Sequence, residues 1–306
     1  MNAMVMLLAC LAAGIVLQRT GKLPDNAPAA LNAYVINVAL PALALTHLHA
    51  TALTVDLLAS AAGAWLMLGS AALFIGLVAS RMNLGAAATG ALILTGGLAN
   101  TSFVGLPMIE AWIGRAGLPY GIVIDQLGSY LALSTFGLIV AARYSGQPMQ
   151  WSVMWRRVVT FPPLIALVLA ILLRPIPFHP ALEDALGRIG ATVAPIALFA
   201  VGCQLRLGEL WSRRGALALG LGYKLVLGPL LIAALCLALL DSNDPDAAFA
   251  RTVVIFEAAM GPMIGAAVVA NHYKLDSGLT SLMVGIGIPM SLLIAPLWLN
   301  VANSMA

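Results

Sequence analysis

Three ionisable side chains lie deep inside apolar stretches of this 306-residue chain: Asp125, Lys224 and Glu257. If these stretches cross a membrane, each charge is costly unless it is paired or hydrated, and such residues mark ion or substrate pathways. If all three are ionised, the trio carries one net negative charge, which a sodium ion or a proton on a carboxyl group would neutralise. The trio, with Ser129 one helical turn from Asp125, therefore predicts coupling to a cation. The alternative is an ion pair of Lys224 with either acid that fixes helix register.

Two stretches combine helix-breaking residues with polar side chains. One reads Thr95-Gly-Gly-Leu-Ala-Asn100-Thr-Ser-Phe-Val-Gly-Leu-Pro107, and the other reads Phe256-Glu-Ala-Ala-Met-Gly-Pro262. Proline removes a backbone donor and glycine adds backbone freedom, so we expect both helices to unwind near mid-membrane. If the breaks meet, half-helices that start near Pro107 and Pro262 would direct their positive dipole ends at the centre. This arrangement predicts an anion site, and the alternative is a pair of packed proline kinks.

Groups around these breaks are the candidate substrate contacts. The Asn100 amide can donate to a carboxylate or coordinate a cation through its oxygen, so Asn100 and Glu257 are also a candidate sodium site. The candidate substrate-binding residues are Asn100, Thr101, Ser102, Gly105, Pro107, Gln126, Met260, Gly261 and Pro262. The alternative for the polar members is interhelical hydrogen bonding.

The composition identifies the class of protein. Hydrophobic residues make up 61% of the chain and charged residues 9%, against about a quarter charged in a soluble domain. The formal net charge is +3, and the lysines and arginines form no basic run, so a nucleic-acid partner is excluded. The chain is predicted to be an all-α membrane protein with the lipid bilayer as its surroundings and no cofactor other than a coupling ion.

Ten apolar stretches are long enough to span a bilayer, which needs about 20 residues per helix. They are residues 3–17, 29–48, 57–80, 86–113, 118–142, 158–174, 189–205, 215–240, 247–271 and 278–301. Counting about 1.5 Å per residue puts Lys224 and Glu257 roughly 14 to 15 Å deep and Asp125 in the outer third of the membrane. The first stretch is a spanning helix and not a signal peptide, because no Lys or Arg precedes it.

Lysine and arginine are distributed unequally between alternate loops, which predicts the orientation. The richer side carries Arg19, Lys22, Arg81, Arg143, Arg156, Arg157, Arg206, Arg213, Arg214 and Lys274. The poorer side carries Arg115, Arg174, Arg188 and Arg251. The richer side is therefore cytoplasmic, and both termini are periplasmic. The multi-pass chain would lie in a bacterial inner membrane.

The chain reads as two related halves. Pro41 and Pro195 lie in similar segments 154 residues apart, and Pro107 and Pro262 in similar segments 155 residues apart. We expect repeats over about 1–142 and 156–303, each of five helices. An odd helix count means that the repeats lie inverted in the membrane, with the broken fourth and ninth helices crossing.

Some residues that often bind metals or form cross-links carry no such signal here. The three cysteines Cys10, Cys203 and Cys236 lie inside apolar runs and are interpreted as small core residues. His47 and His49 lack further metal ligands and are expected at a solvated helix edge. Glu110 and Arg251 are expected at the membrane interface.

Six segments together resemble the auxin efflux carrier family, in the bacterial branch that includes malonate transporters and malate permeases. They are Asn37-Val-Ala-Leu-Pro41, Ala99 to Pro107, Asp125-Gln126-Leu-Gly128, Pro195 to Gly202, Lys224-Leu-Val-Leu-Gly-Pro229 and Glu257-Ala-Ala-Met-Gly-Pro262. The resemblance spans nearly the whole chain.

The resemblance implies a single membrane transporter over 1–306, with ten helices in two inverted repeats, related to the bile acid and sodium symporters. It implies scaffold helices over about 3–48 and 158–205, often dimeric, and moving helices over about 57–142 and 215–301. Asn100 would contact the substrate carboxylate, and Glu257 matches a residue that helps to hold sodium in the bile acid relatives. The long cytoplasmic loop of the plant auxin carriers is missing, so auxin itself is not implied as the substrate.

The sequence therefore predicts a secondary transporter for a small organic anion, a malonate-, malate- or auxin-like carboxylate, coupled to protons or sodium. A passive, potential-driven carrier and a channel are the alternatives within transport. An intramembrane enzyme is the alternative from another class, but Gly-x-Ser-x-Gly, His-Glu-x-x-His and paired-aspartate motifs are all missing from the chain.

Overall fold

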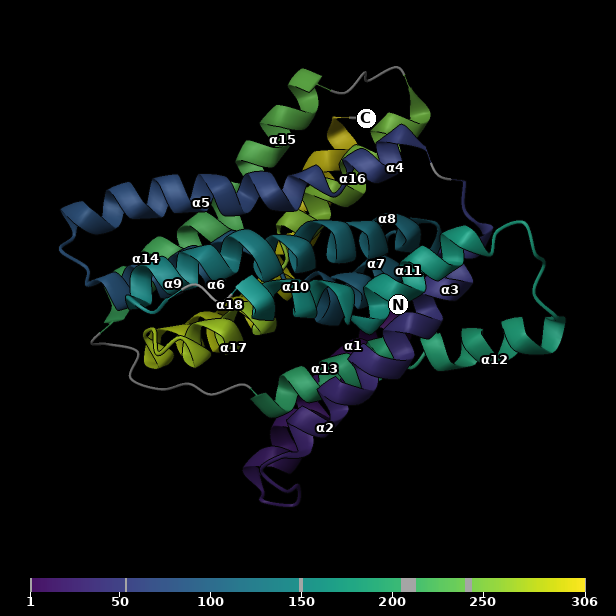
Figure 1. Ribbon diagram of the computed structural model, residues 1–306, viewed down its shortest axis with the longest axis horizontal. Coiled ribbons are helices and arrows are strands. Elements are labelled where there is room, and N and C mark those ends of the chain that lie inside the picture. Colours follow the sequence, from purple (N-terminus) through teal and green to yellow (C-terminus); the bar gives the residue numbers. More distant parts are fainter. Residues whose placement is uncertain (1, 53, 149–150, 205–212, 240–243, 306) are drawn as a thin grey trace.

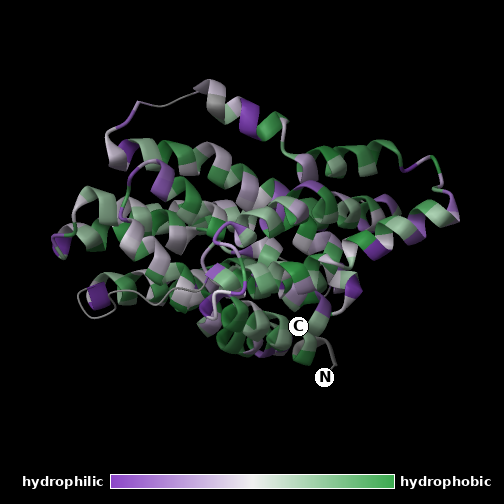
Figure 2. Ribbon diagram, turned by 90° about the horizontal axis from the view of Figure 1, so that it is seen from below, coloured by the Kyte–Doolittle hydropathy of each residue, from purple (hydrophilic) through white to green (hydrophobic). Residues whose placement is uncertain are grey.

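Every regular element that the structure describes is a helix. The computed structural model describes residues 2–52, 54–148, 151–204, 213–239 and 244–305. Lipid offers no hydrogen-bond partners, so an apolar chain satisfies its backbone groups internally as helix. The all-α prediction is confirmed for these residues. Figure 2 shows hydrophobic residues along the helices and hydrophilic residues mainly at their ends and in the connecting segments.

The described residues of the first half of the chain form the α-helices α1 to α9, which can be followed in Figure 1. They are α1 (Asn2–Arg19), α2 (Ala27–Tyr34), α3 (Leu40–Ala50), α4 (Val55–Ala59), α5 (Ala62–Arg81), α6 (Ala86–Gly97), α7 (Leu106–Trp112), α8 (Leu118–Val123) and α9 (Leu138–Ser145). Short π-helical turns join several of them, namely η1 (Val35–Ala39), η2 (Thr101–Gly105), η4 (Ile124–Tyr130) and η5 (Leu133–Gly137). One 3-10 turn, η3 (Arg115–Gly117), precedes α8.

The second half continues in the same way. Its α-helices are α10 (Trp151–Val159), α11 (Pro162–Leu172), α12 (Pro180–Gly190), α13 (Val193–Gln204), α14 (Arg214–Gly222), α15 (Gly228–Leu239), α16 (Pro245–Ala258), α17 (Ile264–His272) and α18 (Ser277–Ser304). The π-helical turn η7 (Tyr223–Leu227) joins α14 to α15.

Six helical segments of the described chain are long and apolar enough to cross a membrane. They are Ala27–Ala50, Val55–Arg81, Arg115–Ser145, Pro180–Gln204, Arg214–Ala238 and Ser277–Ser304. Three shorter apolar helices accompany them, Val5–Arg19, Ala86–Gly97 and Pro162–Leu172. Each of the ten predicted stretches contains helix, while Arg206 and the last residues of the stretches 189–205 and 215–240 lie outside the described residues.

Two sets of helices pack closely. α1 runs along α13, and α3 packs against α11 and α12. The α1–α13 contact depends on glycine, because a Cβ on Gly14 would overlap the carbonyl oxygen of Phe199 and one on Gly202 would overlap that of Leu11. In the second set, α6 is surrounded by α5, α9, α17 and α18. From Thr89 onward every residue of α6 is buried, and the C-terminal end of the helix lies at the centre of the molecule.

The structure corrects the prediction for His49 and describes the surroundings of Arg251. His49 is not a solvated edge, because its Nε2 lies 3.0 Å from the carbonyl oxygens of Leu173 and Ile176 and its ring stacks on Phe178. Arg251 is fully buried on α16, and its Nη2 donates to the carbonyl oxygen of Met305, just beyond the end of α18, at 2.7 Å. Its place at the membrane interface stays a prediction.

Other expectations are met more closely. Glu110 is partly exposed and forms an ion pair with Arg115 at 3.5 Å. Cys203 and Cys236 are buried free thiols, as core residues should be, whereas Cys10 is only half-buried.

Candidate functional site

Two broken helices meet at the centre of the molecule. α6 ends at Gly97 and η2 begins at Thr101, while α16 ends at Ala258 and α17 begins at Ile264. The two breaks lie antiparallel, bridged between Ala99 and Pro262. The backbone N–H of Asn100 donates to the Gly261 carbonyl at 2.8 Å, and that of Met263 donates to the Leu98 carbonyl at 3.0 Å. Main-chain hydrogen bonds thus hold the two breaks together, and we call this contact the crossing.

The first half-helix begins six residues before Pro107, near which its start was predicted. The first break covers residues 98–100, and Pro107 is buried in α7, which continues directly from η2. Proline is accommodated there next to the π-helical turn η2, where the regular α-helical hydrogen bonding is already interrupted. Pro262 does lie in the second break, opposite Ala99, at the bridge position that makes no hydrogen bond. The two prolines are therefore not equivalent in space.

Asn100 caps the half-helix that follows the first break. Its Oδ1 accepts from the backbone N–H of Phe103 at 3.2 Å, and its side chain is buried. Within the described part of the chain, the Nδ2 donor has no hydrogen-bond partner. Because an unpaired buried donor is costly, this amide is ready to bind an acceptor.

Asp125 lies on the π-helical turn η4 and contacts the same half-helix. Its Oδ1 accepts from the Thr101 hydroxyl at 2.6 Å, and both side chains are buried. Asp125 therefore lies close to the crossing, because Thr101 is two residues from the bridge at Ala99. Its depth in the outer third of the membrane stays a prediction.

Glu257 lies in the last turn of α16 with its carboxylate against bare backbone. A Cβ on Gly105 would overlap both carboxylate oxygens, and one on Gly121 of α8 would lie 3.4 Å from Oε1. The side chain is 1% exposed, and neither oxygen has a hydrogen-bond partner among the residues that the structure describes. Gly105 thus makes room for a buried carboxylate whose oxygens accept no hydrogen bond from these residues.

Lys224 approaches from η7. Its Nζ donates to the carbonyl oxygen of Ala258 at 2.8 Å, at the C-terminal end of α16 where the dipole favours a cation. Within the part of the chain that the structure describes, no ion pair within 4 Å joins Lys224 to Glu257 or Asp125. The three ionisable residues surround the crossing as predicted, but not as a direct ion pair.

The remaining candidate residues are buried nearby or within the break. Gln126 and Ser129 lie beside Asp125 on η4, and the oxygen of each side chain has no partner. Ser102 and Met260 are buried. Gly261 has no space for a side chain, since a Cβ would lie 2.7 Å from the Ile288 Cα.

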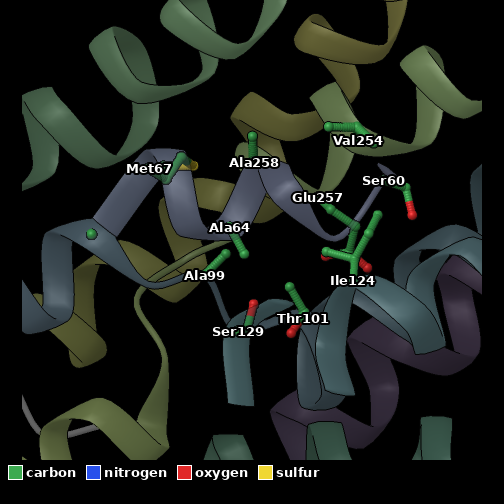
Figure 3. Close-up of a pocket in the computed structure, with 12 residues that line it drawn as sticks. Ser60, Ala64, Met67, Ala99, Thr101, Ile124, Ser129, Val254, Glu257 and Ala258 are labelled. Carbon is green, nitrogen blue, oxygen red and sulfur yellow. The ribbon is translucent and has the colours of Figure 1, made fainter. Parts of the chain in front are cut away.

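A cavity of about 10 Å³ lies beside this cluster, lined among others by Glu257, Thr101, Ser129 and Ser60. Figure 3 shows Thr101 and Ser129 approaching it from one side and Ala64 and Met67 from the opposite side. Such a volume holds about one water molecule, or a cation without its hydration shell. Hydroxyl and carboxylate oxygens are the ligands that a hard cation prefers.

Two larger cavities lie between the packed sets of helices. One, of about 420 Å³, is lined by residues of α1, α2 and α13 and by α17 and α18, and extends from Asp25 to Ile264 at the start of α17. The other, of about 340 Å³, is lined by residues of α3, α7 and α12 and includes His47, Arg115 and Arg188. Each cavity lies beside the second half of one broken helix.

Sequence reasoning missed three features of the site. Gly105 was assigned to the substrate, whereas the structure places it against Glu257. Gly121 and Ser60 were not among the predicted site residues. The sequence feature that could have identified them is a small residue within an apolar helix. The π-helical turns that carry Asp125 and Lys224 have no recognisable sequence signal, although such turns frequently occur at functional sites.

Long apolar helices, two breaks tied at a crossing and buried polar groups with vacant hydrogen-bonding capacity define an α-helical membrane transporter. The family described as membrane transport protein matches residues 1–299, so the chain belongs to this family, that of the auxin efflux carriers. It is a family of transporters and not of enzymes.

Two archaeal proteins are similar to the chain. An uncharacterized transporter of Methanothermobacter thermautotrophicus is 27% identical over 288 residues, which cover 93% of this chain and 92% of the relative. An uncharacterized transporter of Methanocaldococcus jannaschii is 26% identical over 219 residues, covering 68% and 67%.

Proposed function

We propose that this protein is a secondary transporter that moves a small organic anion, such as malonate or malate, by alternating access. The observation that carries the proposal is the pair of vacant groups at the crossing. Asn100 Nδ2 is an unpaired donor suited to a carboxylate, and the Glu257 oxygens are unpaired acceptors suited to a cation. Substrate would also contact Thr101, Ser102 and the backbone at Gly261.

The coupling cation, a proton or sodium, would bind at Glu257, with Asp125 and Lys224 setting the local charge and the Ser129 hydroxyl offering an oxygen ligand. Two carboxylates and one ammonium group leave one net negative charge if all are ionised. The adjacent cavity of about 10 Å³ supports a cation of this size. Without coupling, the same site would serve a passive uniporter driven by the membrane potential, and coupling to sodium alone would make it resemble the bile acid symporters.

The ten apolar stretches would span the membrane as two inverted five-helix repeats, about 1–142 and 156–303. Scaffold helices over about 3–48 and 158–205 would hold the moving helices over about 57–142 and 215–301. The close packing of α1 with α13 and of α3 with α11 supports such a scaffold. The two cavities beside α17 and α7 would be the inner and outer vestibules.

The excess of arginine and lysine in alternate loops supports a cytoplasmic-membrane protein with both termini outside. The resemblance to the auxin efflux carriers supports a homodimer formed through the scaffold. Chemical cross-linking in native membranes would test the dimer, and labelling of cysteines placed in the loops would test the orientation.

Counterflow of labelled malonate in proteoliposomes tests the function. Unlabelled carboxylates serve as competitors, with and without sodium and pH gradients. We expect Glu257→Gln to abolish gradient-driven uptake while exchange persists, and Glu183→Gln, which changes an exposed carboxylate on α12, to behave as wild type. If no carboxylate exchanges in well-folded protein, the anion assignment fails; if Glu257→Gln keeps its gradient response, the coupling assignment fails.

A further inference from the structure

The segment between the two halves has an unusual charge and aromatic content. Residues 143–160 contain three arginines, Arg143, Arg156 and Arg157, two tryptophans and no acidic residue. Nine of these residues form α10. A basic amphipathic helix with tryptophan on its apolar face is the composition that binds the surface region of anionic membranes.

One face of α10 is apolar and uncovered. Trp151, Trp155 and Val159, spaced four residues apart, are 58%, 63% and 62% exposed. Met154 on the other face is buried, and α10 packs on η5 and α11. In a membrane protein an uncovered stripe of this kind contacts lipid, and tryptophan favours the level of the headgroups.

The arginines next to this stripe carry charge without protein partners. Within the described ranges, Arg143, Arg156 and Arg157 have no carboxylate within 4 Å. Arg143 and Arg156 are exposed and Arg157 is half-buried. A guanidinium group beside lipid is stabilised by a phosphate oxygen, to which it can donate two parallel hydrogen bonds.

We propose that α10 binds the headgroup of an anionic phospholipid. The guanidinium groups of Arg156 and Arg157 hold its phosphate, and Trp151 and Trp155 lie along its glycerol and upper acyl region. The charge of the arginines and the apolar stripe beside them fit the two parts of such a lipid.

The bound lipid would act on the candidate site through Tyr130. The Tyr130 hydroxyl donates to the Arg157 carbonyl at 2.8 Å, and its ring stacks on Phe161. Tyr130 is the last residue of η4, which carries Asp125 and Ser129. A lipid that fixes α10 therefore fixes η4, and transport should depend on anionic lipid; this second step rests on the proposed function.

Native mass spectrometry of the full-length protein tests the lipid site without any transport assay. Protein exchanged into mixtures of phosphatidylglycerol and phosphatidylcholine should retain phosphatidylglycerol preferentially. Arg156→Gln/Arg157→Gln should lower the retention ratio roughly ten- to thirtyfold, as expected for two charges at an anionic surface. Arg81→Gln, an exposed arginine at the end of α5, is the matched control and should leave the ratio unchanged.

Brominated lipids supply a second readout. Brominated phosphatidylglycerol should quench tryptophan fluorescence more than brominated phosphatidylcholine in wild type, and Trp151→Phe/Trp155→Phe should remove that difference. Equal retention of both lipids, or a ratio unaffected by the double arginine change, would overturn the proposal. If inorganic phosphate binds and competes fully with the lipid, the proposed lipid site is instead a site for a free anion. Lipid retention without lipid-dependent counterflow would refute only the link through Tyr130.

Discussion

Gly105→Ala should uncouple transport, because Gly105 is the surface on which the Glu257 carboxylate lies. The new Cβ would overlap both carboxylate oxygens. To reach an ordinary contact of about 3.5 Å, each oxygen must retreat by about 1 Å. Forcing one methyl group into a packed interior costs about 1–3 kcal/mol. If this free-energy cost arises only when the Glu257 carboxylate holds its cation, the apparent affinity for the cation falls roughly 5- to 150-fold.

The assay measures two quantities over a range of sodium and proton concentrations. One is the gradient-driven uptake of labelled carboxylate, and the other is its exchange when the cation concentrations on both sides of the membrane are equal. Gly105→Ala should shift the cation dependence and leave exchange in place. Gly69→Ala is the control, since a Cβ there meets nothing within 4 Å.

A second change separates displacement of Glu257 from general damage. Aspartate is shorter than glutamate by one carbon, about 1.5 Å, so Glu257→Asp should partly restore the cation affinity of Gly105→Ala. Wild-type cation dependence in Gly105→Ala would refute the reasoning. A loss of folded protein in detergent that Glu257→Asp does not relieve would also refute it, because the overlap would then lie elsewhere.

Three further substitutions test individual contacts. Thr101→Val should reduce coupled uptake and lower the free energy of unfolding by about 1.5–3 kcal/mol, the value of a hydrogen bond to a charged group. Thr101→Ser should preserve both. Equal behaviour of the two variants would contradict a role for the hydroxyl. Asn100→Ala should lose both the helix cap, worth about 1 kcal/mol, and substrate affinity, whereas Asn100→Ser should keep the cap and lose only substrate affinity. The melting temperature measures the loss of the cap, and the KM for exchange measures the loss of affinity. His49→Ala removes the contact to the carbonyls of Leu173 and Ile176 and should lower the melting temperature without changing KM; a changed KM would place this helix end in the transport pathway.

Much of the fold could be predicted because lipid leaves an apolar chain few choices. Stretches of about 20 apolar residues must become helix, and helices are found in all ten stretches. The second break was predicted correctly, since Gly261 and Pro262 are adjacent and both disfavour helix. Burial of Asp125, Lys224 and Glu257 followed from their position within apolar runs.

The first break could not be located in the same way. Pro107 lies in continuous helix behind the π-helical turn η2, so it does not mark the break. Residues 98–100 leave the helix where the backbone of Leu98 and Asn100 pairs with Met263 and Gly261. This is an interaction between segments about 160 residues apart in the chain, so the glycines within residues 95–107 predict a break in this stretch but not its position at 98–100. The burial of Arg251 could not be predicted for the same reason, since the Met305 carbonyl oxygen that accepts from its Nη2 lies beyond the end of α18.

The bridge between Ala99 and Pro262 has a mechanical consequence. Its two hydrogen bonds join main chain to main chain, so no side-chain substitution removes them directly, and pulling on either half-helix pulls on the other. If the protein works by alternating access as proposed, the polar groups at the crossing would therefore move together with both broken helices. Access to the two sides of the membrane would then change as this unit slides past the helices around it, with the two breaks still joined.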